Sequence, residues 1–232
     1  MQIFITGGTG FIGREVSARL AARGHAVRVL ARAGSEQKVS PGCQPVLGNA
    51  LDDKTFLHAV QGCDTFVHLV GVPHPGPGKA EQFSTVDLAS IRAAVAAAVA
   101  VGVQRFVYLS VARPAPVMKA YQTVRAEGEA LVRAAGLNAV ILRPWYVLGR
   151  GRRWPVVLLP LYWILERCPG TRDSARRLGL VSLRQITASL VDSIEDPRIG
   201  TRIIEVPEIR KAQAHGPRSR GADRSHPESV GR

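Results

Sequence analysis

The chain has 232 residues, of which 46% are apolar and 21% charged, so it is long enough to bury one sizeable core and we expect one domain. Its three cysteines lie far apart and form no C-x-x-C arrangement, which suggests neither a disulfide framework nor a zinc site and favours a reducing compartment. The net charge of +13 invites a nucleic-acid interpretation, but only 6% of the residues are aromatic and no recognition helix or stacking platform is evident. We therefore expect an arginine-rich surface and no nucleic-acid partner.

The first segment, IFITGGTGFIGREV from Ile3 to Val16, predicts a strand, a glycine turn and a helix in direct succession. In its spacing G-x-x-G-x-x-G, Gly7 permits a tight turn, Gly10 lets a diphosphate approach the backbone, and Gly13 lets helix and strand pack closely. The positive end of the helix would face the anion. The alternative is a glycine-rich turn that binds nothing, and the placement between strand and helix favours a nucleotide site. Because the strand begins at about residue 2, we expect no signal peptide and a cytoplasmic protein.

The second expected strand, His25–Arg32, ends in a residue that bears on the choice of cofactor. A site for NAD places an acid there to hold the ribose 2'-hydroxyl, whereas an arginine accommodates a 2'-phosphate. Here the strand ends in Arg32, with Arg28 nearby, and the first acid after the strand is Glu36. The sequence therefore favours NADP(H), the alternative being that Arg32 is a solvated charge at a strand end.

The next elements are a short strand, Gln44–Ala50, a helix that Asp52 can cap, and a buried strand, Asp64–Val70. For Asp52, capping of the helix and contact with adenine remain equal alternatives. The loop 71–79 is rich in Gly and Pro and comes after the carboxyl end of a strand, where open α/β sheets bind ligands. His68 alternates with apolar neighbours, so we expect it to be packed, whereas His74 lies in the loop and has no visible partner.

Further strand and helix pairs succeed one another in regular order. We expect a helix over Gln82–Val101, a strand over Arg105–Ser110, a helix over Met118–Ala135 and, within Leu137–Gly149, a further strand that ends at Arg143 and Pro144. Tyr121 and Arg125 are four residues apart in the second helix and share one face. About six repeats of strand and helix predict an α/β fold with a doubly wound parallel sheet.

Five blocks carry a resemblance to a known family: TGGTGFIG (residues 6–13), VHLVG (67–71), RFVYLS (105–110), the Tyr121 helix with RAEGEALVRAAGL (125–137), and ILRPWYVLG (141–149). Over about residues 1–206 the chain resembles the short-chain dehydrogenase/reductase superfamily, in its extended or atypical NAD(P)-binding branch. The resemblance implies a Rossmann fold and a nicotinamide dinucleotide cofactor. The implied cofactor contacts are Gly7, Thr9, Gly10, Phe11, Ile12, Gly13, Arg32, Asp52, Leu69, Val70, Gly71 and Pro144.

The resemblance also implies a catalytic set. In active members a tyrosine acts as general acid and base, a lysine four residues later holds the ribose, and a serine at the end of the preceding strand orients the substrate oxygen. Tyr121 stands in the tyrosine position and Arg125 in the lysine position, and Ser110 lies near the serine position. The chain departs from the pattern at Arg125, because arginine keeps the positive charge but cannot be deprotonated.

The last third begins with an apolar run, Trp154–Leu165, which is too short to span a bilayer. It is expected to be the wall of a substrate pocket, a face buried against the domain or a partner, or a segment lying on a membrane surface. We expect residues 150–207 to form a small substrate-side extension, with a strand and helix over Gly179–Asp196 and a closing strand over Thr201–Pro207. Residues 208–232 are expected to form a disordered basic tail.

These features predict an NADP(H)-dependent oxidoreductase that acts on a hydrophobic carbonyl or alcohol. Tyr121 would be the proton donor, Ser110 the orienting group and Arg125 the ribose contact. The alternative is a non-catalytic protein that binds the dinucleotide and regulates or stabilises a partner.

Overall fold

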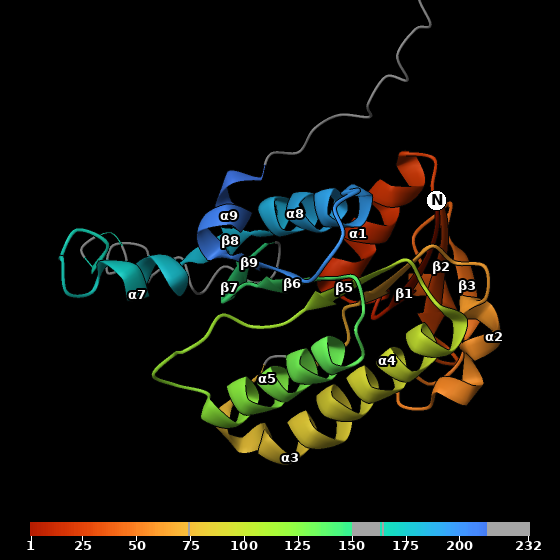
Figure 1. Ribbon diagram of the computed structural model, residues 1–232, viewed down its shortest axis with the longest axis horizontal. Helices are drawn as coiled ribbons and strands as arrows, with labels where there is room; N and C mark the ends of the chain where they lie inside the picture. The colour runs from red at the N-terminus through yellow and green to blue at the C-terminus, as the bar shows by residue number, and fades with distance from the viewer. Residues whose placement is uncertain (74, 150–162, 164, 213–232) are drawn as a thin grey trace, which may run out of the picture.

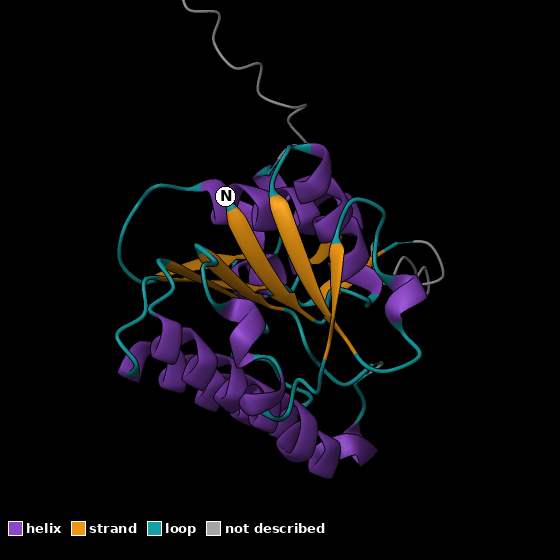
Figure 2. Ribbon diagram, turned by 90° about the vertical axis from the view of Figure 1, so that its right-hand side faces the viewer, coloured by secondary structure: helices purple, strands orange, loops and turns teal. Residues whose placement is uncertain are grey.

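The computed structural model describes residues 1–73, 75–149, 163 and 165–212. In this part of the chain one central sheet lies between two groups of helices (Figures 1 and 2). All seven strands of the sheet pair in parallel, which confirms the predicted doubly wound sheet. From one edge to the other they are β3 (Gln44–Leu47), β2 (Ala26–Ala31), β1 (Gln2–Thr6), β4 (Thr65–His68), β5 (Arg105–Leu109), β6 (Ala139–Arg143) and β9 (Arg202–Glu205).

The strand order places a topological switch point between β1 and β4. The chain runs outward from β1 through β2 to β3, and then returns to lay β4 along the other side of β1. The two strands pair in register, with Thr6 opposite His68. Sheets of this kind bind ligands at the carboxyl ends of the strands beside the switch point.

Helices cover both faces of the sheet (Figure 1). On one face lie α2 (Leu57–Val60), α4 (Ala89–Val101) and α5 (Lys119–Ala134). On the other lie α1 (Phe11–Ala22), α8 (Leu183–Glu195) and α9 (Val206–Lys211). The smaller elements are η1 (Glu36–Lys38), η2 (Asp53–Thr55), η3 (Pro77–Lys79), α7 (Arg172–Arg177), and a second, two-stranded parallel sheet of β7 (Tyr146–Leu148) and β8 (Leu180–Ser182).

The core results from the alternation of side chains along the strands. In β1, Phe4 joins the core on the α4 and α5 face, whereas Ile3 and Ile5 join the core beneath α1 and α8. Phe66 of β4 lies between Phe4 and Phe106, with ring centroids 5.2 and 5.4 Å away. These aromatic contacts tie the three middle strands together beneath the α4 and α5 layer.

A continuous helical segment, Ala80–Val101, is longer than the sequence predicted. It consists of α3 (Ala80–Gln82), the π-helical turns of η4 (Phe83–Leu88) and α4. Its length and apolar composition match those of a membrane span. Its side chains at Phe83, Ile91 and Ala94 are nevertheless buried in the core, as in the central helices of globular proteins.

The strand expected to end at Arg143 and Pro144 is confirmed, because β6 ends at Arg143 and a separate short strand, β7, follows Pro144. One sequence prediction differs from the structure. Residues 208–211, expected to lie in the disordered tail, belong to α9, in which Ile209 is fully buried. Pro207 stands in the first turn of that helix, where its missing N–H costs nothing.

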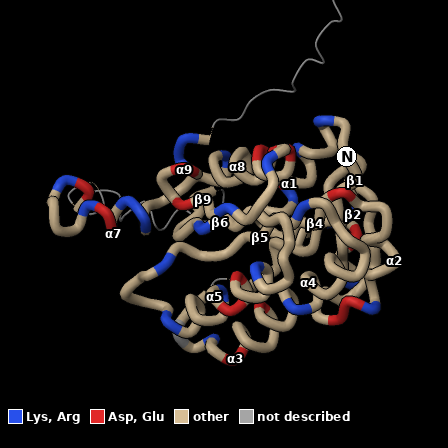
Figure 3. The backbone as a smooth tube through the Cα atoms, in the orientation of Figure 1, with Lys and Arg blue, Asp and Glu red and all other residues tan. Residues whose placement is uncertain are grey.

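Charged residues of both signs occur along the described part of the chain. Lys and Arg occur on most elements, with Asp and Glu between them (Figure 3). Several expectations lie outside the described residues: His74, most of Trp154–Leu165, and residues 213–232 of the predicted tail. From the apolar run only Trp163 and Leu165 are described, and Trp163 is exposed beneath the Arg167 guanidinium.

Candidate dinucleotide and active site

The glycine turn between β1 and α1 has the shape of an anion cradle. Gly7 has a φ of +77°, which only glycine adopts readily. A Cβ on Gly13 would stand 2.2 Å from the Gly7 carbonyl oxygen, so the helix can approach the turn only without a side chain there. The helix begins after Gly10 with no side-chain cap and no acidic residue in its first turn. The N–H groups at the start of α1 and the glycine backbone, which carries no side chains, suit a diphosphate. The residues present therefore fit a dinucleotide.

The loop after β4 borders the glycine turn. A Cβ on Gly7 would lie 2.6 Å from the carbonyl carbon of Leu69, and the Leu69 amide donates to the Thr6 carbonyl at 2.9 Å. Val70 and Gly71 continue this loop along the same edge of the sheet. Two of the expected cofactor contacts, Leu69 and Val70, therefore lie beside the turn, at the switch point.

Arg32, Arg28 and Asp52, which the sequence places near the adenosine end of the cofactor, have different surroundings in the structure. Arg32 is exposed and directly succeeds the last residue of β2, at the carboxyl edge of the sheet. Arg28 points elsewhere, because its guanidinium donates to the carbonyls of Ala59 and Gln61. Asp52 accepts a hydrogen bond from the Lys54 amide at 3.1 Å and so caps η2. Of the two arginines, only Arg32 lies exposed at the carboxyl edge of the sheet, and its contact with a 2'-phosphate stays a prediction.

Tyr121 lies in the first half of α5, partly exposed. Its ring packs against Phe83 with centroids 4.9 Å apart, and the Arg125 guanidinium carbon lies 5.2 Å from its centroid. The predicted shared helix face of Tyr121 and Arg125 is therefore present. A cation beside a phenol favours the phenolate that remains after proton transfer.

Arg125 is buried, and its two terminal nitrogens donate to protein acceptors, whereas its buried Nε has no hydrogen-bond partner. It donates to the Leu109 carbonyl at 3.0 Å, to the Val70 carbonyl at 3.2 Å and to Asp87 at 2.5 Å. Burial alone would lower the pKa of Arg125, but Tyr121, Tyr108 and Asp87 outweigh it and hold the pKa above its ordinary value. The side chain thus places a permanent charge between the carboxyl ends of β4 and β5, and its role as a ribose contact stays a prediction.

Asp87 is a site residue that sequence reasoning missed. It is buried in η4, accepts from the Val72 amide at 3.0 Å and pairs with Arg125. Such π-helical turns are frequent at functional sites. A signal was present, because Asp87 is the only acid within the largely apolar segment 82–101.

Ser110 lies one residue beyond β5, as expected, but its hydroxyl donates to Glu129 at 2.7 Å. Glu129 is completely buried and also accepts from Arg143 and Arg113. Burial raises the pKa of Glu129, yet the bonds from Arg143, Arg113 and Ser110 outweigh it and lower the pKa to about 2. The orienting role of Ser110 stays a prediction, and the serine is part of a buried ionic network that the sequence did not reveal.

The remaining candidates are buried. His68 is fully buried, as predicted, and its Nδ1 is 2.8 Å from the Thr6 hydroxyl. Burial first, and then the charge of Arg125, lower the pKa of His68 to about 3, so the ring is neutral. The Pro144 carbonyl accepts from the Ala112 amide, which ties the end of β6 to the loop after β5.

Known proteins resemble the chain in sequence. The NAD(P)H-binding family matches residues 7–153. A ceramide reductase of Caulobacter vibrioides (strain NA1000 / CB15N) is 28% identical over 216 residues, 90% of this chain and 65% of that protein. A 4-hydroxy-2-methyl-3-oxo-4-farnesyl-3,4-dihydroquinoline-1-oxide ketoreductase of Stigmatella aurantiaca is 30% identical over 171 residues, 64% of this chain and 51% of that protein. The chain therefore spans between half and two thirds of the length of these relatives.

Solved structures resemble the chain in fold. The Bordetella bronchiseptica enzyme WbmH in complex with NAD+ has a TM-score of 0.66 and 19% identity, over 88% of this chain and 75% of that one. The UDP-glucuronic acid 4-epimerase of Bacillus cereus in complex with NAD also has a TM-score of 0.66 and 19% identity, over 88% of this chain and 77% of that one. At these identities the likeness concerns the fold.

Proposed function

Because the chain belongs to the NAD(P)H-binding family, we propose that it is an NADP(H)-dependent oxidoreductase acting on a hydrophobic carbonyl or alcohol. One observation carries this proposal. The uncapped glycine cradle and the Tyr121–Arg125 pair lie at the same carboxyl edge of the sheet, on the two sides of the switch point. A dinucleotide held at the turn and extended along this edge would bring its reactive end toward Tyr121.

Each residue of the site would have its own part in the reaction. The nicotinamide supplies or accepts the hydride when the cofactor is bound. Tyr121 would give its proton to the carbonyl oxygen of the substrate, and the fixed charge of Arg125 would favour the resulting phenolate. Arg125 cannot itself pass a proton on, because its guanidinium does not deprotonate. Proton resupply to Tyr121 would therefore come from solvent through its exposed side.

The proposed substrate class rests on two supports. The relatives include a ceramide reductase and a 3-beta-hydroxysteroid dehydrogenase of Mycolicibacterium neoaurum, both named for lipophilic substrates. The apolar run Trp154–Leu165 comes after the last strand of the site and supplies side chains that could line such a pocket. We propose that this run contacts the hydrophobic part of the substrate.

The preference for NADP(H) is proposed from Arg32. NADPH should bind at least about tenfold more tightly than NADH, because a charge-assisted contact to the 2'-phosphate is absent from NADH. Arg32→Ala should remove most of this difference, and Arg92→Ala, which alters an exposed arginine on α4, should leave it unchanged. Fluorescence titration measures the affinities of each protein for both cofactors. Equal affinities of the wild-type chain for the two cofactors would refute the preference.

A second candidate function is a dinucleotide-binding protein without turnover. The observation in its favour is that Arg125 and Ser110 direct their side-chain donors to protein acceptors. Such a protein would bind NADPH with the same dependence on Arg32. It would not oxidise NADPH, whichever carbonyl substrate was added. A screen of long-chain ketones for NADPH oxidation separates the two functions.

A further inference from the structure

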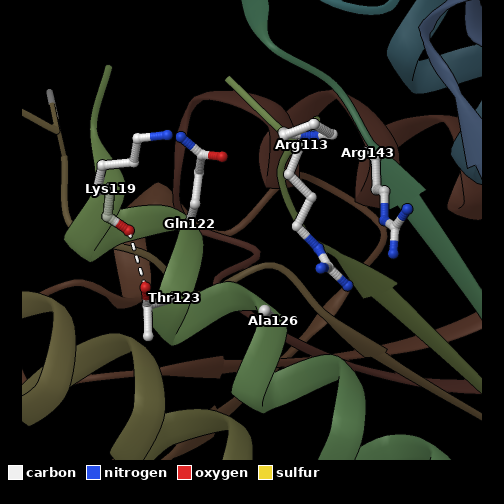
Figure 4. A pocket seen from close by; sticks show the side chains of 7 residues that line it. Arg113, Lys119, Gln122, Thr123, Ala126 and Arg143 are labelled. Carbon is white, nitrogen blue, oxygen red and sulfur yellow. Dashed lines mark hydrogen bonds between the residues drawn. The ribbon is translucent and has the colours of Figure 1, made fainter. Parts of the chain in front are cut away.

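A pocket of about 280 Å³ lies beside the first half of α5 (Figure 4). Side chains of α5 form one wall, and residues from the loop after β5 and the end of β6 form the other. Its lining residues are Arg113, Pro114, Lys119, Gln122, Thr123, Ala126 and Arg143. Tyr121 and Arg125 lie on a different face of the same helix, so the pocket is distinct from the proposed active site.

The lining is strongly positive. Three of its residues are cationic and none is acidic. Arg113 and Arg143 share one buried carboxylate, Glu129, which lies behind the pocket and also pairs with Arg133. Arg143 makes a second pair with Glu205. With Lys119 included, the cations of this cluster outnumber its two carboxylates, so an excess of positive charge faces the opening.

Some donors at the pocket are uncommitted, whereas others are engaged. Among the described residues, the Nε of Arg113 is buried without a hydrogen-bond partner. Lys119 is exposed at the first position of α5, and its side chain reaches over the pocket (Figure 4). The Gln122 amide is fully engaged by the carbonyls and amide of the loop 115–117, so it shapes the wall.

We propose that this pocket binds the phosphate group of a small phosphate monoester. A phosphate monoester carries a charge of about −1.5 to −2 and three strong acceptor oxygens at neutral pH. The ammonium of Lys119 and the guanidinium of Arg113 supply the donors, and Glu129 holds both arginines in place. The volume suits a phosphate with a small organic group and is too small for a dinucleotide.

The test is a calorimetric titration of phenyl phosphate into the full chain at low salt, with NADPH present at saturation so that the glycine turn is occupied. We expect saturable, one-to-one binding. Lys119→Glu should weaken it at least about tenfold, through loss of one charge-assisted contact and the added repulsion. The matched control is Lys211→Glu, which makes the same charge change at an exposed residue of α9 on the opposite face of the sheet and should leave binding within about twofold.

A second variant tests shape without changing charge. Ala126→Phe fills the pocket and should abolish binding of phenyl phosphate. Both variants should keep the melting temperature of the parent, since Lys119 stands at a helix start, where an acid is favourable, and Ala126 is only partly buried. Absence of saturable binding, equal weakening by the two charge reversals, binding retained in Ala126→Phe, or binding of inorganic phosphate alone would each overturn the proposal.

Discussion

At the scale of single residues, the site depends on Arg125 and Asp87. The family resemblance implies a lysine at the position of Arg125. The Arg125 guanidinium donates hydrogen bonds to the carbonyls of Leu109 and Val70 and to the Asp87 carboxylate. The planar, five-donor fork makes all three contacts possible at once, which a lysine ammonium on a flexible stem would not reproduce. The substitution therefore exchanges a mobile proton carrier for a fixed charge with a structural role.

We predict that Asp87→Asn lowers the free energy of unfolding by about 3 kcal/mol, because it leaves the Arg125 charge buried without its counter-ion. The matched control is Glu127→Gln, which breaks the exposed pair with Arg92 and should cost less than about 1 kcal/mol. Urea denaturation measures both values. An equal loss in the free energy of unfolding for the two substitutions would show that the buried pair stabilises the fold no more than the exposed pair does.

The buried His68 should make the free energy of unfolding depend on pH. Its pKa is about 3 in the folded chain and near its ordinary value of 6.5 in the unfolded chain, so only the unfolded chain takes up a proton between these values. This contribution to stability is complete above about pH 6.5 and is lost as the pH falls toward 3. Between pH 7 and pH 5 the wild-type chain should lose about 2 kcal/mol more than His68→Gln.

The same denaturation series contains its own control. The pKa of Glu129 is lowered to about 2, so the stability that this carboxylate contributes is lost only below about pH 4.5, outside the window assigned to His68. If the free energy of unfolding falls equally for the wild-type chain and His68→Gln between pH 7 and pH 5, His68 does not cause the pH dependence.

At the scale of elements, sequence patterns located the strands and helices and placed their ends within a few residues. Apolar runs predicted β1, β5 and α5 almost to their bounds. The end of β6 before Pro144 was predicted, whereas the continuation of structure past Pro207 into α9 was not. A proline can end one element and begin the next, and only the packing of the residues after it decides between these outcomes.

The helix α9 provides a prediction at this scale. Ile209 is fully buried, and Arg210 donates to the Leu180 carbonyl and to Glu166. Truncation after Pro207 removes both residues and should lower the free energy of unfolding by about 3 kcal/mol relative to truncation after Ala212. Thermal denaturation of the two shortened chains makes the comparison, with Ile209→Ala in the full chain as a check. The same melting temperature for both truncations would mean that α9 is not part of the folded unit.

At the scale of the whole molecule, the sequence predicted the edge of the sheet that forms the site but not the network that supports it. The four-residue spacing of Tyr121 and Arg125 is local and visible in the sequence. Asp87, the partner of Arg125, is 38 residues away from it in the sequence, and Glu129, the partner of Ser110, is 19 residues away. No local sequence pattern encodes contacts of this kind. The pairing of strands brings these groups together, so they emerge only with the fold.

The central claim is that the chain uses the dinucleotide it holds, with Tyr121 as proton donor. Its most direct test is NADPH oxidation by the wild-type chain and Tyr121→Phe with a panel of long-chain and polycyclic ketones. The account predicts turnover with at least one ketone and a loss of at least about 100-fold in kcat for the variant, at NADPH affinity unchanged within about twofold. Equal turnover by the two proteins, or tight binding of NADPH with no ketone reduced, would contradict it.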